Sequence, residues 1–270
     1  MKQNIYDNPE FFHHYQALRQ TPYNYNNLLE QPAIKSLLPN LQNLQMLDIG
    51  CGMGEFAYYC IESQAKHVTA IDVSRNMLAI ARREYAHPKI DYRLYAIEDY
   101  HVAPESFDCI TSSLSLHYIE NFDAVISKIA SILRSNGIFI FSIEHPIATA
   151  RKTMVDNWIY DANGNRNHYA IDNYQDEGLR EQTWFVDGVV KYHRCISTII
   201  NSLIAHGFTI EKLLEPLPDL EAVEKLPSLE KELRRPSFLV IRAKKIIIKI
   251  WRSRSNSSSR PFKLYVLNFT

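Results

Sequence analysis

Short apolar runs alternate with segments of helical periodicity between residues 45 and 145. Buried parallel strands read as continuous apolar runs, because both of their faces are covered. Alternating strands and helices at this spacing predict a parallel α/β sheet with right-handed crossovers. The predicted strands are residues 44–49, 67–73, 90–97, 107–112 and 137–144, and the helices between them include 56–63, one N-capped by Ser74, and 123–133.

The pattern changes on both sides of this region. Residues 150–193 contain two hairpin turn signals, at 161–164 and 187–188, each flanked by strand-prone residues. They predict an inserted β-rich cap instead of another strand–helix–strand unit. Helices are predicted at 9–20, 25–38, 195–206 and 219–234, and two further strands at 208–214 and 238–243.

Composition excludes several classes of protein. Charged residues make up 22% of the chain, and its 16 Tyr, 12 Phe and 3 Trp argue against disorder. Residues 1–15 have no apolar run, and no stretch approaches 18 apolar residues, so neither a signal peptide nor a spanning helix is expected. Four cysteines without a C-x-x-C pair suit buried, reduced thiols, and a cytoplasmic location is expected.

The zero net charge conceals an asymmetry. Residues 244–270 carry seven Lys and Arg and no acid, so residues 1–243 have a formal charge of −7. A mildly acidic body disfavours a broad nucleic-acid interface. Residues 246–270 are expected to form a poorly ordered basic tail, with contact to a membrane or to RNA as the alternative.

Three of only eight glycines, Gly50, Gly52 and Gly54, lie between the first strand and its helix. Such a turn lets the backbone lie flush against a ligand at a helix N-terminus, in the crevice at the carboxyl ends of the strands. Asp72 ends the second strand 22 residues after Gly50, a spacing that suits a carboxylate binding ribose hydroxyls. The alternative is a tight turn with a helix-capping aspartate.

Charge discriminates between two nucleoside ligands. A dinucleotide turn reads G-x-G-x-x-G and holds a pyrophosphate, whereas the third glycine here comes one residue early. Asp48 precedes the first glycine by two residues. Its carboxylate would repel a pyrophosphate and attract the ammonium and sulfonium of S-adenosylmethionine. This turn therefore favours S-adenosylmethionine over NAD.

Five segments of the chain resemble the successive motifs of class I S-adenosylmethionine-dependent methyltransferases, closest to the bacterial type 11 group. They are LDIGCGMGEF (47–56), AIDVS (70–74), AIEDY (96–100), SFDCITSSLSLHYIEN (106–121) and LRSNGIFIFSIEHP (133–146). The resemblance implies a Rossmann-like, seven-stranded, mostly parallel sheet with an antiparallel C-terminal hairpin and helices on both faces. The expected parts are a helical lid (1–40), a methyltransferase domain (41–245) with a cap at about 150–193, and the tail.

The same resemblance implies the cofactor contacts. Asp48, Gly50, Cys51 and Gly52 would line the methionine part, with Gly54 completing the turn; Asp72 and Val73 would hold the ribose, and Ile97, Glu98 and Asp99 would lie at the adenine. One position departs from the family. Many relatives have an acid where this chain has Ala96, so adenine recognition would depend on backbone groups or on Asp99.

Methyl transfer from a sulfonium requires alignment, and a base only if the nucleophile is protonated. His117, Glu144 and His145 follow the fourth and fifth strands and are the candidate catalytic residues. The alternative for each histidine is to orient a loop or the cofactor carboxylate, and Glu144 is either a base or an anchor. Candidate substrate contacts are Tyr15, Arg19, Ser115, Tyr192 and His193.

Some of these contacts have a second interpretation. Tyr15 and Arg19 share one helix face, as part of the lid or as packing residues, and His193 could instead fasten the cap to the sheet. No cluster with metal-ligand spacing is present, so no metal is expected. The leading hypothesis is a methyltransferase acting on a small molecule in a pocket enclosed by the cap, without nucleic-acid or membrane partners. The alternatives are an NAD-type oxidoreductase and a non-catalytic nucleoside-binding module.

Overall fold

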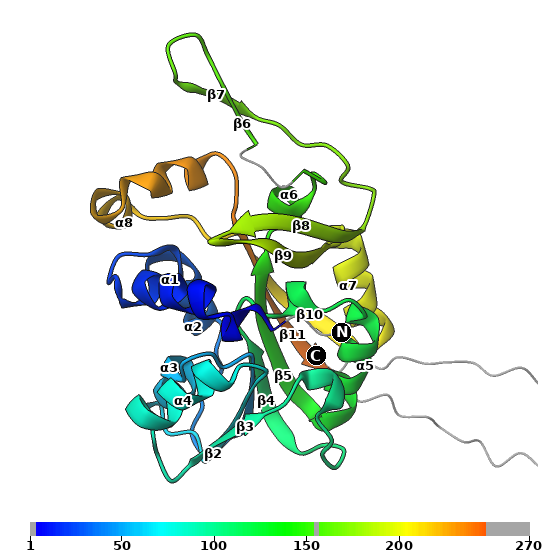
Figure 1. Cartoon of the computed structure of the whole chain (residues 1–270). Helices are drawn as coiled ribbons and strands as arrows, with labels where there is room; N and C mark the ends of the chain where they lie inside the picture. Colours follow the sequence, from blue (N-terminus) through cyan, green and yellow to red (C-terminus); the bar gives the residue numbers. More distant parts are fainter. Residues whose placement is uncertain (1–3, 154–156, 247–270) are drawn as a thin grey trace, which may run out of the picture.

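A seven-stranded sheet forms the centre of the protein in this computed structural model, which describes residues 4–153 and 157–246 (Figure 1). The strand order is β10-β11-β5-β4-β1-β2-β3, and β11 is antiparallel to both of its neighbours. The predicted mostly parallel sheet with a C-terminal antiparallel hairpin is confirmed. The strands are β1 (Gln45–Ile49), β2 (His67–Asp72), β3 (Ile90–Leu94), β4 (Phe107–Ser112), β5 (Leu133–Glu144), β10 (Phe208–Leu214) and β11 (Phe238–Lys245).

Helices cover both faces of this sheet. Successive side chains of a strand point to opposite faces, so Met46 joins the core under α3 and α4 while Leu47 joins the core under α5 and α7. The two cores fix the sheet between its helical layers. The helices are α2 (Gln31–Ser36), α3 (Glu55–Glu62), α4 (Arg75–Glu84), α5 (Phe122–Ile132) and α7 (Ile196–Ala205).

The N-terminal segment contains η1 (Ile5–Asp7) and α1 (Pro9–Gln20). Asn8 caps α1 by accepting hydrogen bonds from two backbone amides of its first turn. The single helix predicted at 25–38 is instead a π-helical turn, η2 (Asn26–Glu30), followed by α2. A glutamate in this π-turn, Glu30, is fully buried and accepts hydrogen bonds from Ser113 and Ser142 at the ends of β4 and β5.

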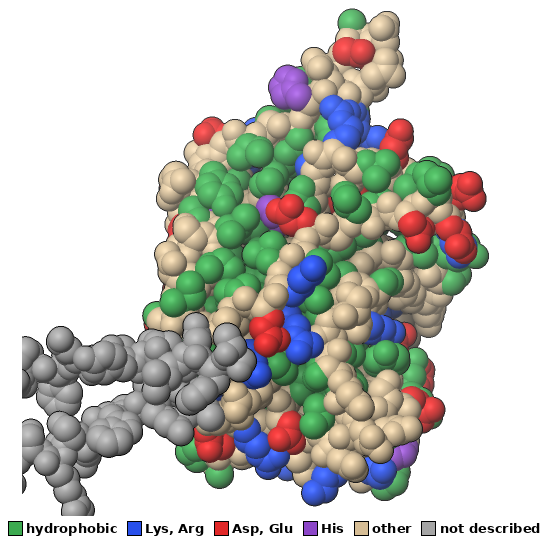
Figure 2. All heavy atoms as spheres, turned by 180° about the vertical axis from the view of Figure 1, so that it is seen from behind, with side chains coloured by type: hydrophobic (Ala, Val, Ile, Leu, Met, Phe, Trp, Pro, Cys, Tyr) green, Lys and Arg blue, Asp and Glu red, His purple; other side chains and the backbone are tan. Residues whose placement is uncertain are grey.

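Two small antiparallel sheets lie outside the central sheet. The β6–β7 hairpin stands away from the body in both views (Figures 1 and 2), whereas β9 contacts the loop after β4. The domain boundaries predicted around them remain a prediction. These elements are α6 (Pro146–Thr149), β6 (Trp158–Tyr160), β7 (Arg166–Tyr169), β8 (Gly178–Trp184) and β9 (Val186–His193).

The predicted turn at 187–188 is wrong by about two residues. The β8–β9 turn is at Phe185, which adopts a left-handed φ of +62°, and Gly188 lies inside β9. Phe185 stacks on His14 with ring centroids 5.5 Å apart and meets Phe11 edge-on. This aromatic packing on α1 is a tertiary contact that the local Asp-Gly signal does not contain.

Other element boundaries also differ from the prediction. The third strand ends at Leu94, and Ile97–Asp99 forms a 3-10 turn, η3. The predicted helix 219–234 divides into α8 (Leu220–Lys225) and the 3-10 segment η5 (Pro227–Leu233), because proline has no backbone N–H to continue a helix. Within residues 4–153 and 157–246, no helix has the length and apolar composition needed to cross a membrane.

Candidate functional site

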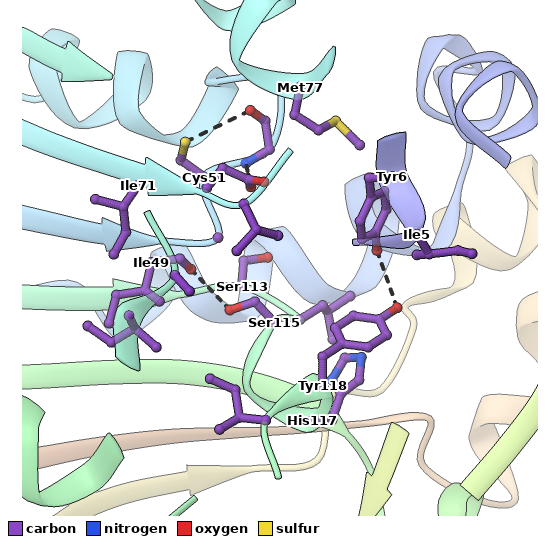
Figure 3. Close-up of a pocket in the computed structure, with 18 of the residues that line it drawn as sticks. Ile5, Tyr6, Ile49, Cys51, Ile71, Met77, Ser113, Ser115, His117 and Tyr118 are labelled. Carbon is purple, nitrogen blue, oxygen red and sulfur yellow. Dashed lines mark hydrogen bonds between the residues drawn. The ribbon is translucent and has the colours of Figure 1, made fainter. Parts of the chain in front are cut away.

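A cavity of about 590 Å³ lies at the carboxyl ends of the central strands (Figure 3). Fifteen of the eighteen predicted site residues line it, while Asp99, His145 and His193 do not. Predicted cofactor and acceptor residues therefore share one cavity. Those lining it are Asp48, Gly50, Cys51, Gly52, Gly54, Asp72, Val73, Ile97 and Glu98 from the cofactor set, and Tyr15, Arg19, Ser115, His117, Glu144 and Tyr192 from the acceptor set.

The glycine turn after β1 has a backbone that other residues rarely adopt. Gly50, Gly52 and Gly54 have φ values of +72°, +54° and +92°. A Cβ on Gly50 would lie 2.5 Å from the Ser115 Cβ, so the loop after β4 approaches the turn too closely for a side chain. Apart from Gly52 and its chain neighbours, no atom of the described residues lies within 4 Å of a Cβ placed on Gly52, which lines the cavity. The turn thus presents bare backbone to the cavity.

Asp72 braces this turn from the end of β2. Its carboxylate oxygens accept hydrogen bonds from the backbone N–H groups of Gly52 and Ser74, each 2.8 Å long. Burial raises the pKa of Asp72, although these backbone hydrogen bonds favour the ionised form. A carboxylate has about four lone-pair sites, so Asp72 retains acceptor capacity toward the cavity that it lines.

Asp48 supplies the test of whether the cavity fits a cationic ligand. Its Oδ1 accepts a hydrogen bond from Thr111, and Oδ2 is buried without a partner in the described part of the chain. Burial raises the pKa of Asp48 to about 7. An unpaired buried carboxylate is costly, and a nearby cation stabilises its ionised form. The site therefore fits the ammonium and sulfonium of S-adenosylmethionine and opposes a pyrophosphate.

The turn η3 forms the cavity wall assigned to adenine. Ile97 and Glu98 line the cavity, as does Ala96, the position that lacks the acid of many relatives. The ammonium of Lys128 on α5 donates hydrogen bonds to three backbone carbonyls of this turn, including those of Ile97 and Glu98. Lys128 holds the turn in place, and its position in a helical pattern carried no signal for that role.

Two tyrosines that line the cavity, Tyr6 in the N-terminal segment and Tyr118 in the loop after β4, were not predicted to be site residues. The Tyr6 and Tyr118 hydroxyls lie 3.2 Å apart and join the N-terminal segment to the loop after β4 (Figure 3). Asp7 accepts hydrogen bonds from the Ser74 hydroxyl, at 2.6 Å, and from the amides of Arg75 and Asn76 at the start of α4. These contacts hold the segment beside the Asp72 end of the cavity.

Aromatic side chains from α1 and the β8–β9 turn form another wall. Tyr15 meets Tyr6 and Trp184 edge-on, with ring centroids 5.0 Å and 6.0 Å away. One turn along the same helix face, Arg19 forms an ion pair with Glu55, at the start of α3. The Tyr15–Arg19 face of α1 therefore faces the cavity and also packs, so the two predicted interpretations of this face are not exclusive.

His117 and Glu144 meet at the acceptor side. The backbone N–H of Glu144 donates to His117 Nδ1 at 3.5 Å, and burial lowers the pKa of His117 to about 4. Burial opposes ionisation of Glu144, but the adjacent Lys191 ammonium and His117 lower its pKa. Near neutral pH this wall therefore holds a neutral imidazole beside a carboxylate that is already paired. Lys191 was not among the predicted site residues.

Two predicted site histidines do not line the cavity, and each makes contacts of the kind given above as its alternative. Both His145 and His193 are fully buried. His145 caps α6 through Nδ1 and contacts Glu215 through Nε2, at 2.9 Å. His193 contacts Thr149 through Nδ1 and the Tyr174 carbonyl through Nε2, each at 2.9 Å. With all four ring nitrogens engaged, these side chains fasten loops and the β9 strand instead of facing an acceptor.

The fold and the cavity define a class: α/β enzymes that bind S-adenosylmethionine at the carboxyl ends of a Rossmann-like sheet. Comparisons with known proteins agree. The family model for the methyltransferase domain of type 11 matches residues 47–141. An S-adenosylmethionine-dependent methyltransferase of Mesorhizobium loti is 38% identical, with a TM-score of 0.75 over 80% of this chain and 97% of that chain.

Two further relatives match over most of their length. A Listeria monocytogenes protein assigned to the same class is 39% identical, with a TM-score of 0.75 over 80% of this chain and 96% of that chain. An uncharacterized protein of Haemophilus influenzae is 38% identical over 91% of this chain and 98% of its own length. The chain thus belongs to the S-adenosylmethionine-dependent methyltransferases of the type 11 group, and S-adenosylmethionine is its cofactor.

These relatives do not assign a methyl acceptor. Curated relatives whose names specify one, such as malonyl-[acyl-carrier protein] or ubiquinone biosynthesis O-methyltransferases, are covered over 41% to 52% of their own length. The matched family domain ends at residue 141, before the β8–β9 strands and their cavity residues.

Proposed function

We propose that the protein transfers the methyl group of S-adenosylmethionine to a small-molecule acceptor by in-line displacement. The observation that carries this proposal is the single cavity of about 590 Å³, which contains both the cofactor residues and the acceptor candidates. Pockets of about 300–1,000 Å³ are typical of small-molecule sites. Walls from α1, the loop after β4 and β9 surround it, and together they would exclude water from the reacting atoms.

Each half of the cavity has a distinct part in this reaction. The cofactor supplies an activated methyl group. Asp48 would bind the positive charge of the methionine end, Asp72 would accept hydrogen bonds from the ribose, and the turn at Ile97 would lie against the adenine. The nucleophile of the acceptor forms a bond to the methyl carbon as the carbon–sulfur bond breaks on the opposite side, and sulfur retains the electron pair.

His117 and Glu144 are the candidates for aligning that nucleophile. Both line the cavity, and Glu144 is the carboxylate that would receive a proton if the nucleophile carries one. His117, neutral because burial lowers its pKa to about 4, would orient the acceptor by a hydrogen bond. Lys and Arg are interspersed with Asp and Glu on the face in Figure 2, a distribution that favours a small acceptor over nucleic acid.

Ligand-dependent thermal unfolding tests the cofactor half. S-adenosylhomocysteine should raise the melting temperature and NAD should not, because only the former places an ammonium, and no pyrophosphate, beside Asp48. A shift with NAD alone would support the oxidoreductase alternative instead.

Labelled methyl transfer tests the acceptor half. The protein would be incubated with methyl-labelled S-adenosylmethionine and a metabolite extract from which macromolecules have been removed. Label should appear in a small-molecule fraction. Retention of S-adenosylhomocysteine binding without transfer to any fraction would support the non-catalytic module, and transfer only to a macromolecular fraction would refute the small-molecule acceptor.

A further inference from the structure

A buried lysine contacts the acceptor wall of the cavity. Lys191 on β9 is 2% exposed, and its ammonium forms an ion pair with Glu144 at the end of β5. The same ammonium lies 5.3 Å from the ring centroid of Trp184. Glu144 and Trp184 both line the cavity. One cation is therefore shared by a carboxylate and an aromatic ring of the same wall.

Strand packing alone does not explain a charge at this position. Along β9, Val189, Lys191 and His193 are buried, while Val190 and Tyr192 line the cavity. An apolar residue at position 191 would satisfy this alternation. A buried ion pair is often no more stabilising than apolar residues of similar volume. The pair is therefore better explained by what it does to Glu144 than by stability.

Glu144 keeps one oxygen available for a ligand. Lys191 engages Oε1, and no hydrogen bond between residues of the described ranges reaches Oε2. Because the ammonium balances the carboxylate, Glu144 offers a hydrogen-bond acceptor without a net negative charge at the wall. A permanently cationic acceptor molecule would find no uncompensated carboxylate at this position.

His117 has the complementary polarity. Its Nδ1 accepts the hydrogen bond from the Glu144 backbone, so in the neutral ring the proton resides on Nε2, which then acts as a donor. The wall therefore pairs one donor with one acceptor. An O–H group, or an N–H group whose nitrogen has a free lone pair, satisfies both, since it donates to the carboxylate and accepts from the imidazole. A carboxylate on the acceptor molecule has no hydrogen to donate to Glu144, so it would leave the Glu144 oxygen without a partner and place two acceptors side by side.

We propose that Lys191 is a positioning residue that orients Glu144 to accept a hydrogen bond from the methyl acceptor, and that this acceptor carries a neutral O–H or N–H group on a flat apolar body. The flat body follows from the aromatic walls, to which Tyr6, Tyr118, Trp184 and Tyr192 contribute. This inference rests on the proposed function, because it concerns the acceptor half of that cavity.

Carbon-13 NMR of labelled glutamate carboxyl groups, with S-adenosylhomocysteine bound, tests the positioning role. Glu144→Gln assigns the signal. Lys191→Met should raise the pKa of Glu144 by about one unit or more, a tenfold change in proton affinity, and Lys191→Arg should restore it. The charged or titratable groups that act on this carboxyl include Lys191, His117 and Arg235, and the Tyr118 hydroxyl also interacts with it. Lys152→Met, which removes an exposed ion pair with Asp176, is the matched control.

Two probes of equal ring size, phenol and benzoate, test the acceptor class by ligand-detected NMR on the same complex. Phenol should bind the wild type at least about fivefold more tightly than benzoate, and Lys191→Met should weaken phenol binding by a similar factor because Glu144 is no longer held in place. Equal or tighter binding of benzoate to the wild type, or an unchanged Glu144 pKa in Lys191→Met, would overturn the proposal. If Lys191→Met does not fold, the double variant Lys191→Met/Glu144→Gln replaces it in the probe experiment, where a retained phenol preference is the overturning result.

The two experiments separate this inference from the proposed function. Neither requires turnover, so both give a result even if labelled methyl transfer fails. Transfer to a small molecule that lacks any O–H or N–H group would leave the proposed function standing and overturn the inference. If no transfer is found but the Glu144 titration and the phenol preference are as expected, the inference about Lys191 and Glu144 stands. The proposed methyl transfer is then refuted.

Discussion

The two halves of the cavity are built in different ways. The cofactor half consists of backbone turns and strand ends that lie between residues 48 and 98, in register along the central sheet. The acceptor half is assembled from side chains of the N-terminal segment, the loop after β4, the end of β5 and β9. A binding site made of loops and inserted strands can change without moving the scaffold beneath it.

This difference predicts different responses to mutation. Changes in the cofactor half should act on the affinity for S-adenosylmethionine, because its turn geometry and carboxylates are fixed by the sheet. Changes in the acceptor half should act on turnover and leave the cofactor bound. Four measurements test this division between the halves, from the largest expected effect to the smallest.

Asp72→Ala should weaken S-adenosylhomocysteine binding by about 100-fold or more, measured by calorimetry. The substitution removes the proposed ribose contact and also the hydrogen bonds that brace Gly52 and Ser74; bonds to a charged group contribute about 1.5–3 kcal/mol each. Asp91→Ala is the control, since Asp91 pairs with Arg93 and does not line the cavity. An unchanged dissociation constant for Asp72→Ala would refute the ribose assignment.

His117→Ala should lower turnover by about 100-fold while the affinity for S-adenosylhomocysteine stays within about twofold. His117 lies in the acceptor half, and its contact with the Glu144 backbone would be lost. His101→Ala, at an exposed position, is the control. Turnover near that of the wild type would show that His117 only packs. A large loss of cofactor affinity would contradict the assignment of His117 to the acceptor half.

Binding of S-adenosylmethionine should tighten about tenfold between about pH 6 and about pH 8, and Asp48→Asn should remove this dependence. Burial raises the pKa of Asp48 to about 7, and the bound cation favours the ionised form, so binding below that pH must also release a proton. By the same linkage, the contribution of Asp48 to the stability of the free protein is present at acid pH and is lost as pH rises through about 7. Calorimetry at several pH values measures the first effect, and a pH-independent affinity would contradict it.

Tyr6→Phe should have the smallest effect, a change of less than about fivefold in S-adenosylhomocysteine affinity. The variant keeps the edge-on ring contacts and loses only the hydroxyl contact with Tyr118, and one hydrogen bond contributes about 1 kcal/mol. Tyr23→Phe, at an exposed position, is the control. A loss as large as that of Asp72→Ala would mean that the N-terminal segment, not the sheet, controls cofactor binding.

Local sequence patterns predict the cofactor half well. An apolar strand, three glycines and an acid at the next strand end lie between Gln45 and Asp72, so their arrangement follows from one strand–turn–helix–strand unit. Short-range signals also identify the Ser74 cap of α4, whose side chain accepts a hydrogen bond from Met77. Most of the central sheet follows in the same way.

The acceptor half is less predictable because its residues meet only in the tertiary structure. Nothing in the local sequence distinguishes Lys191 from an exposed lysine on a strand. Its burial depends on an ion pair with Glu144, 47 residues earlier. His145 and His193 have the right residue type at the right end of the fold, yet their neighbours engage both ring nitrogens. The Phe185 turn differs from the Asp-Gly signal for the same reason, since packing on α1 overrides it.

Asp7 couples the local unfolding of the N-terminal segment to that of the first turn of α4. Its carboxylate holds donors at Ser74, Arg75 and Asn76, and the Asn4 side chain donates to the Val73 carbonyl, so the two segments cannot separate without leaving polar groups unpaired. In native-state hydrogen exchange, the amides of Arg75 and Asn76 should therefore open together with residues 4–8. Exchange of the amides in the first turn of α4 would therefore report whether the N-terminal segment is docked beside the cavity.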